Sequence, residues 1–105
     1  MNWNIYLSGE IHSDWRQQII DGCTKLDLPV SFSSAVTDHS ASDAAGDLLG
    51  SEEKNFWRDH KSAKVNKIRT QTHIEHCDIA VVRFGSQYKQ WNAAFDAGYC
   101  AALNK

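Results

Sequence analysis

The chain has 105 residues, of which 42% are hydrophobic and 23% are charged. This is enough for one hydrophobic core, too little for two, and too apolar for a disordered chain. The formal net charge is −2, whereas proteins that bind DNA or RNA typically carry an excess of basic residues. Apolar runs are far shorter than a membrane span, and the N-terminus lacks the basic start of a signal peptide. We therefore expect a single cytoplasmic domain over residues 1–105, with neither nucleic acid nor a membrane among its partners.

The first third of the chain predicts a strand, a helix and a second strand. Trp3–Leu7 is short, aromatic and β-branched, and it ends at a Ser-Gly pair, which is typical of a buried strand leading into a tight turn. A helix is predicted over Ser13–Lys25, with the Ser13 hydroxyl as N-cap and an apolar stripe that begins at Trp15. Pro29–Phe32 is the second predicted strand.

The remaining chain predicts a loop, a helix, a strand and a last helix. Ser33–Asp59 is interpreted as a long loop with short helical turns, and Lys61–His76 as a helix. The expected core-facing side chains of this helix are Ala63, Val65, Ile68 and Thr72. Cys77–Phe84 is the clearest strand, and its continuous apolar run predicts burial on both faces. The last helix covers Lys89–Leu103, with apolar residues at helical spacing at Trp91, Ala94, Phe95, Gly98, Ala102 and Leu103.

This order of elements predicts a three-layer α/β fold of the flavodoxin or Rossmann type, with a parallel sheet whose strand order begins 2-1-3. No strand is predicted after the last helix, so the outer edge of the third strand should be open, which proteins usually avoid. Two explanations stay open: the chain lacks a C-terminal strand, or a partner subunit covers this edge.

A ligand site is expected beyond the carboxyl ends of the first and third strands, where the strand order reverses. Ser8–His12 forms one lip of this predicted crevice and Gly85–Asn92 the other. Both segments lead into helix N-termini, whose free backbone N–H groups attract anions.

Asp96 is the residue most indicative of chemistry, because it lies among small and aromatic residues where a carboxylate is costly to bury. Two structural explanations stay open beside a functional one: an exposed helix position, or a buried pair with Arg69 or Arg83. Tyr6 and Trp91 are the aromatic side chains that we single out as candidates to line a ligand site.

The cysteines and histidines form no recognisable disulfide or metal-binding pattern. Cys23, Cys77 and Cys100 form no CxxC pair and are expected to be reduced thiols, although a nucleophilic Cys77 beside His76 stays open. His73 and His76 can share a helix face, but no metal-binding spacing such as HExxH is present. We predict neither a metal nor a cofactor.

Several segments carry a resemblance to a known family. Ile5–Gly9 is similar to the first strand and glycine loop of the nucleoside 2-deoxyribosyltransferases, and Cys77–Val82 is similar to their third strand. Trp91–Ala101 resembles their signature helix, in which a catalytic carboxylate precedes Gly-Tyr-Ala. Gly9–Arg16 and Tyr88–Asn92 resemble the YtoQ-like branch of this family more closely, and the resemblance covers nearly the whole chain.

The resemblance implies transfer or hydrolysis of the N-glycosidic bond of a deoxynucleoside or its monophosphate, with Asp96 attacking the anomeric carbon. It implies that Tyr6 orients this carboxylate or lines the pocket, that Ser8 and Gly9 hold the sugar or a 5′-phosphate, and that Asn92 binds sugar hydroxyls. The implied substrate-binding residues are Ser8, Gly9, Glu10, Arg69, Trp91 and Asn92.

The chain departs from the family pattern at three places. The nucleophile is usually glutamate, which is one methylene longer than Asp96. Gln90-Trp91-Asn92 stands where the family often has Asp-x-Gly, and Arg69 stands where it has another acidic residue. These losses favour an alternative, a non-catalytic module that binds a nucleotide or sugar phosphate. A third hypothesis is an oligomeric domain whose open sheet edge pairs with another copy.

Overall fold

The computed structural model describes residues 1–35, 55–87 and 90–105, which fall into two compact units. The first unit, Met1–Ser34 with His73–Lys105, holds the sheet, and the second is Ala35–Thr72. The predicted single domain over the whole chain stays a prediction.

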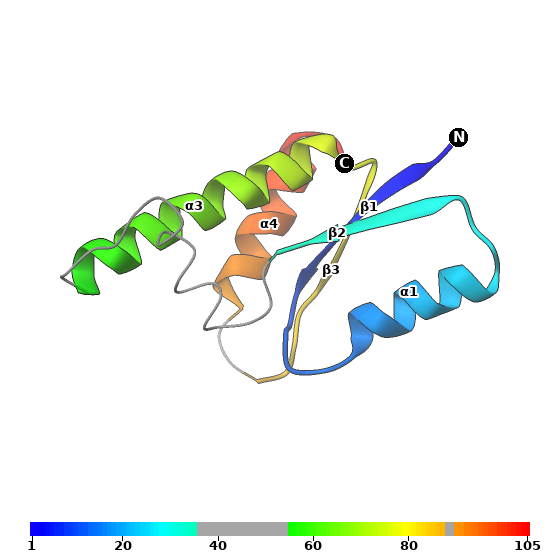
Figure 1. Cartoon of the computed structure of the whole chain (residues 1–105), viewed down its shortest axis with the longest axis horizontal. Helices are drawn as coiled ribbons and strands as arrows, with labels where there is room; N and C mark the ends of the chain where they lie inside the picture. Colours follow the sequence, from blue (N-terminus) through cyan, green and yellow to red (C-terminus); the bar gives the residue numbers. More distant parts are fainter. Residues whose placement is uncertain (36–54, 88–89) are drawn as a thin grey trace. The chain divides into compact units, whose positions relative to one another are not determined.

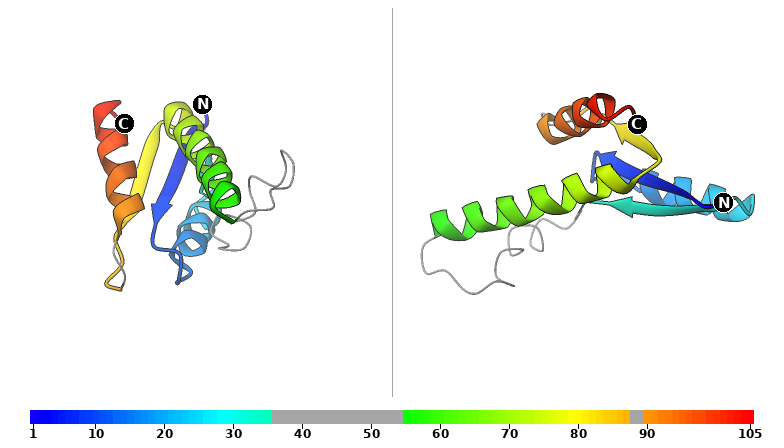
Figure 2. Two further views of the ribbon diagram at one scale, coloured as in Figure 1. Left: turned by 90° about the vertical axis from the view of Figure 1, so that its left-hand side faces the viewer. Right: turned by 90° about the horizontal axis from the view of Figure 1, so that it is seen from above.

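The sheet of the first unit has three parallel strands in the order β2-β1-β3, which confirms the predicted α/β class and strand order (Figure 1). The strands are β1, Trp3–Gly9; β2, Val30–Ser34; and β3, Ile79–Arg83. Seen from above in Figure 2, the strands follow one another in this order. The middle strand is β1, where Tyr6 pairs with Ser33 on one side and with Ala80 on the other.

Two faces of β1 are covered by different helices. The described helices are α1, Trp15–Lys25; α3, Asn55–His76; and α4, Trp91–Ala102. Because side chains alternate along a strand, Ile5 and Leu7 face α1 and pack with Trp15, whereas Tyr6 packs with Cys100 of α4. In Figure 1, α1 and α4 accordingly lie on opposite sides of the sheet. None of the described helices combines the length and the apolar character needed to cross a membrane.

The start of α1 differs from its prediction. The helix begins at Trp15 rather than Ser13, because the Ser13 hydroxyl donates to the Glu10 carboxylate instead of capping the helix. Asp14 takes the N-cap position without a side-chain capping bond, and its carboxylate accepts a hydrogen bond from Gln18.

The start and buried face of α3 also differ. The helix begins at Asn55, inside the predicted loop, and the part of the loop prediction that covers residues 36–54 lies outside the described residues. Ala63, Ile68 and Thr72 are exposed, so their predicted core positions are wrong. The isolated apolar residues of this polar helix do not mark its inner face, since Ser62 is buried instead.

The edge strand and the last helix bury less apolar surface than predicted. β3 lies at the edge of the sheet, so Ile79 is exposed, and Phe84 just beyond the strand is exposed as well. α4 buries Ala93, Asp96 and Cys100, whereas Trp91 and Phe95 are exposed. Its inner face is therefore not the one its largest apolar residues indicate.

Candidate functional site

Three polar side chains are buried together between β1 and α4. Tyr6, Ser8 and Asp96 are only 0%, 2% and 6% exposed. Tyr6 and Ser8 are two positions apart on β1, so both face α4. Asp96 lies one helical turn before Cys100, whose side chain is in the same core cluster as Tyr6.

One carboxylate oxygen of Asp96 accepts both hydrogen bonds. Ser8 Oγ donates to Asp96 Oδ2 at 2.5 Å, and Tyr6 Oη donates to the same oxygen at 3.4 Å. The Ser8 bond has the short length of a hydroxyl bound to an ionised acceptor. Asp96 is therefore not at an exposed position, and within the described residues its partners are hydroxyl groups rather than Arg69 or Arg83.

Burial raises the pKa of Asp96, and the hydrogen bonds from Ser8 and Tyr6 offset part of this rise. The ionised form is thus disfavoured by its surroundings and favoured by two aimed donors. A buried carboxylate whose pKa is shifted by burial and by aimed donors is a candidate for a functional site.

The ring of Tyr6 is also fixed by His73, in the last turn of α3. The two rings stack with centroids 6.0 Å apart and an interplanar angle of 22°. The sequence analysis considered His73 only together with His76, for a metal site, and did not predict this contact with Tyr6.

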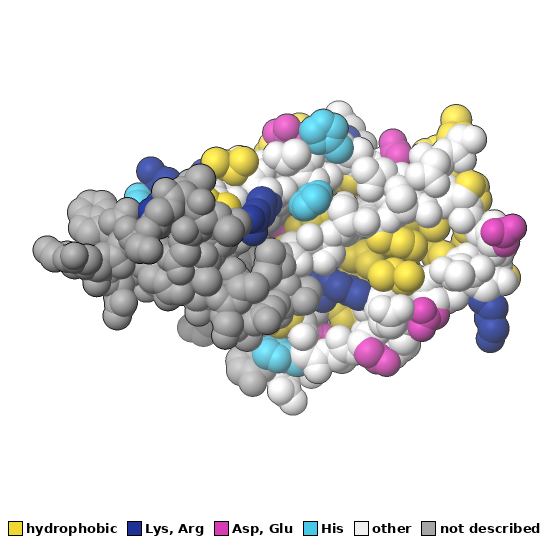
Figure 3. Space-filling model, in the orientation of Figure 1, with side chains coloured by type: hydrophobic (Ala, Val, Ile, Leu, Met, Phe, Trp, Pro, Cys, Tyr) yellow, Lys and Arg dark blue, Asp and Glu magenta, His cyan; other side chains and the backbone are white. Residues whose placement is uncertain are grey.

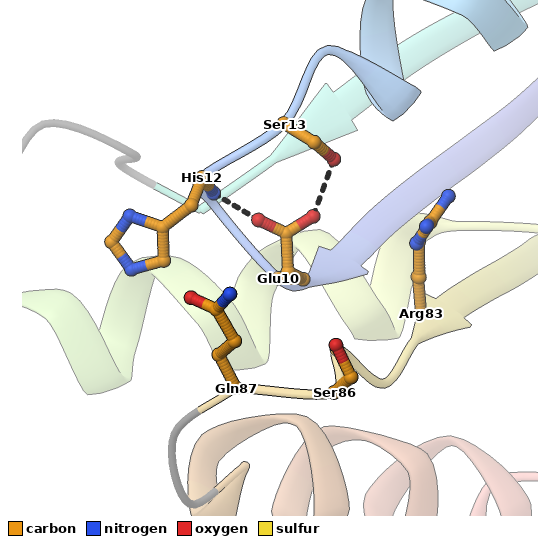
Figure 4. A pocket seen from close by; sticks show the side chains of 7 residues that line it. Glu10, His12, Ser13, Arg83, Ser86 and Gln87 are labelled. Atoms are coloured by element: carbon orange, nitrogen blue, oxygen red, sulfur yellow. Dashed lines mark hydrogen bonds between the residues drawn. The ribbon is translucent and has the colours of Figure 1, made fainter.

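A polar cavity of about 230 Å³ opens between the ends of β1 and β3, where the crevice was expected (Figure 4). Its lining residues are Glu10, His12, Ser13, Arg83, Gly85, Ser86 and Gln87. The Glu10 N–H donates to the Arg83 carbonyl oxygen at 3.0 Å and so joins the two lips. Asp96 is not part of the lining, and the buried carboxylate is linked to the cavity through the consecutive residues Ser8–Glu10.

Glu10 presents an ionised carboxylate to this cavity. Its Oε2 accepts a hydrogen bond from Ser13 Oγ at 2.5 Å, and its Oε1 accepts one from the His12 N–H (Figure 4). The hydrogen bond from Ser13 keeps the pKa of Glu10 below its usual value, and Arg83 acts in the same direction. Glu10 is thus suited to accept hydrogen bonds and poorly suited to donate a proton.

Gly9 is required by the neighbouring strand. Its φ is +117°, and a Cβ at this position would lie 2.0 Å from the Arg83 carbonyl oxygen. Both the backbone conformation and the available space therefore admit only glycine. A role of Gly9 in ligand approach stays a prediction.

Three other predicted residues are not brought to Asp96 by the described contacts. Trp91 is 71% exposed at the start of α4, and Asn92 is exposed one turn before Asp96. Arg69 belongs to the second unit. Their substrate-binding roles stay predictions.

The thiols at the core of the first unit are poor nucleophiles. Cys77 and Cys100 are buried and form no disulfide, and burial raises the pKa of both. Cys77 donates to the Ile74 carbonyl oxygen rather than to a histidine. This arrangement favours the interpretation as packed thiols over the nucleophilic alternative. Within the described ranges, no group of three or more His, Cys, Asp or Glu side chains could hold a metal ion.

Comparisons with known proteins agree with the resemblance. Residues 6–105 match the family model described as "Nucleoside 2-deoxyribosyltransferase YtoQ". The chain is also 37% identical over 106 residues to the "Uncharacterized protein YtoQ" of Bacillus subtilis (strain 168), in a match that covers 100% of this chain and 72% of that protein. Both matches extend over Tyr6, Ser8 and Asp96.

Proposed function

Because the chain belongs to the nucleoside 2-deoxyribosyltransferase YtoQ family, we propose that it transfers or hydrolyses the N-glycosidic bond of a deoxynucleoside or deoxynucleoside monophosphate. The family membership supports this substrate class. The chemistry rests on one observation, the buried carboxylate of Asp96 with two hydroxyl donors on a single oxygen.

In the proposed first step, Asp96 attacks C1′ of the sugar through the oxygen that Ser8 and Tyr6 do not bind. The bond between C1′ and the base breaks, and the base departs with the bonding electron pair and takes up a proton from water. A covalent ester between the sugar and Asp96 results. A second base or a water molecule then attacks C1′ and releases the carboxylate, as in retaining glycosidases.

Ser8 and Tyr6 have the same part in this proposal and differ in how strongly they contribute. Both hold Oδ2, so they fix the direction in which the other oxygen, Oδ1, points. Burial makes the ionised carboxylate costly, so formation of the neutral ester relieves an unfavourable charge. The shorter Ser8 bond is expected to contribute more to this positioning than the Tyr6 bond.

The cavity between the strand ends is the proposed location of the polar part of the substrate. Glu10 offers an ionised acceptor there, while Arg83 and Gln87 offer donors. A mixed lining of this kind suits the donors and acceptors of a nucleoside. Over the described part of the face in Figure 3, acidic and basic side chains are interspersed, which fits a small molecule better than a nucleic acid.

The test is base exchange. The protein is incubated with each of the four common 2′-deoxynucleosides, or their 5′-monophosphates, and with isotope-labelled adenine. Chromatography then detects labelled nucleoside or released base. Asp96→Asn keeps the size of the side chain and an acceptor for Ser8 but removes the nucleophile, so turnover should fall by at least about a thousandfold. Turnover that survives in Asp96→Asn shows that Asp96 is not the nucleophile.

A second candidate function is binding of a nucleotide or sugar phosphate without catalysis. It is favoured by Gln90, which stands where the family often has an acid and whose amide donates to the Gln87 carbonyl oxygen at 2.9 Å. Calorimetry with deoxynucleoside monophosphates distinguishes the two functions. Saturable binding without turnover, unchanged by Asp96→Asn, supports the binding module and contradicts the enzyme.

We also propose that the protein is a homo-oligomer. β3 has the outer position in the sheet, and Phe84 and Phe95 are exposed beside it and on α4. Unpaired strand edges and exposed aromatic side chains are features that proteins usually cover. Sedimentation at several concentrations should show association, and a strict monomer contradicts it.

A further inference from the structure

The turn after β1 is held by the first two residues of α1. Trp15 Nε1 donates to the Glu10 carbonyl oxygen at 2.6 Å, and Arg16 Nη1 donates to the same oxygen at 2.6 Å. Arg16 Nη2 also donates to the Gly9 carbonyl oxygen at 3.3 Å. Trp15 and Arg16, called the α1 clamp below, therefore bind two consecutive peptide carbonyls.

The clamp acts on a segment that no regular element holds. β1 ends at Gly9 and α1 begins at Trp15, so the intervening residues lie outside both the strand ladder and the helix. This segment is one lip of the polar cavity. Glu10 also makes bonds within the lip and to Arg83, and the clamp adds three hydrogen bonds to the carbonyls of Gly9 and Glu10.

The inward position of Arg16 carries a free-energy cost. Burial lowers the pKa of Arg16, and its Nε is buried without a hydrogen-bond partner. The guanidinium carbon lies 4.7 Å from the centre of the Trp15 ring, and the charge of Glu10 offsets only part of the effect of burial on the pKa of Arg16. An arginine near the start of a helix could extend into water at less cost. The position of Arg16 against the turn therefore indicates that it holds the Gly9 and Glu10 carbonyls.

We propose that Trp15 and Arg16 are positioning residues for substrate binding: by holding the Glu10 carbonyl, they fix the Glu10–Ser13 lip of the cavity. The identity of the substrate rests on the proposed function, whereas the placement of the lip does not. Neither clamp side chain donates to Asp96, so the clamp is expected to affect binding more than the chemical step.

The kinetic test compares Arg16→Met with Lys25→Met, which removes an exposed cation from the far end of the same helix. Arg16→Met should raise KM about tenfold, because hydrogen bonds from a charged donor are lost, while kcat should stay within about threefold. Lys25→Met should change neither. Arg16→Lys should recover part of the loss, since an ammonium group can reach only one of the two carbonyls at a time. Trp15→Phe removes the N–H donor and keeps an aromatic ring, and it should raise KM about threefold.

A second measurement needs no turnover. The ¹H–¹⁵N signals of the His12 and Ser13 amides should shift in Arg16→Met and Trp15→Phe, and these amides should exchange faster with solvent. They should not change in Lys25→Met. If no deoxynucleoside is converted, the proposed function is wrong, but the amide signals still test whether Trp15 and Arg16 hold the lip.

Two outcomes overturn the inference. In the first, KM and the lip amides of Arg16→Met match those of Lys25→Met. In the second, kcat and Tm fall together while KM is unchanged, which is the result of general destabilisation. If Arg16→Met does not fold, Arg16→Lys and Trp15→Phe give the same decision.

Discussion

The helices α1 and α4 cover opposite faces of β1 with opposite distributions of polarity. α1 buries Trp15 and exposes Gln17 and Gln18, as an amphipathic surface helix does. α4 buries Asp96 and exposes Phe95. Burying a carboxylate and exposing an aromatic ring both cost free energy. Both faces contribute to the core, but only the α4 face also buries a carboxylate.

The largest expected effect is a difference in the free energy of unfolding between substitutions on the two faces of β1. Leu7 is 1% exposed on the α1 face, so Leu7→Ala should lower the free energy of unfolding by about 3 kcal/mol. Phe95 is a larger side chain but is 52% exposed, so Phe95→Ala should cost less than about 1 kcal/mol in the monomer. Urea denaturation at low protein concentration measures both. Equal losses would contradict the contrast between the faces.

The next effect concerns the polar face of the same strand. Ser8→Ala removes the shorter hydrogen bond to Asp96, and kcat/KM should fall about tenfold to a hundredfold. Because this hydrogen bond lowers the pKa of Asp96, its loss should move the acid limb of the pH–rate profile to higher pH. A lower rate with an unchanged profile would mean that Ser8 does not act through the carboxylate.

A smaller effect should appear in the pH dependence of stability. The pKa of Asp96 is raised in the folded state, so the folded protein holds this proton more tightly than the unfolded chain does. The associated stability is complete below the unfolded pKa of about 3.9 and is lost as the pH rises through the folded pKa. Asp96→Asn should therefore have a Tm a few degrees above that of the natural chain at pH 7, with a difference that shrinks toward pH 4. Thermal denaturation across this range checks the sign, and a lower Tm at pH 7 contradicts it.

The smallest expected effect is a gain in stability from replacing a helical glycine, and it should be the same in α1 and α4. Gly22 in α1 and Gly98 in α4 have open space where a Cβ would lie. Gly22→Ala and Gly98→Ala should each add about 0.5–1 kcal/mol to the free energy of unfolding, because alanine favours the helix. Calorimetric unfolding of the two variants provides the measurement. A gain in α1 with a loss in α4 would show that the outer face of α4 is covered in solution.

The strands could be predicted from local patterns, and their order and the position of the cavity from general rules for parallel sheets. Short apolar runs that end at glycine mark strands, and the topology then brings their ends together. The inner face of α4 could not be predicted, because periodicity assigns large apolar residues such as Phe95 to the core and cannot anticipate a buried carboxylate. The prediction that Ser13 caps the helix was wrong for a related reason. The Ser13 hydroxyl can bind either the helix end or Glu10, and only the path of the turn decides between them.

The α1 clamp was missed altogether. Arg16 donates to carbonyls six and seven positions earlier in the chain, and a long side chain that turns back on its own backbone leaves no periodic signal. The resemblance to the family did direct attention to Asp96. Its contact with Ser8, however, depends on packing between residues 88 positions apart, which only the folded chain reveals.

The close approach of β3 to Gly9 has a consequence for engineering. Any side chain installed at that position must displace the Arg83 peptide, and this peptide also accepts the Glu10 N–H. Widening the cavity from the β1 side would therefore dismantle the junction that supports both of its walls. A redesign of ligand preference should instead vary Ser86 and Gln87, two exposed side chains of the opposite loop.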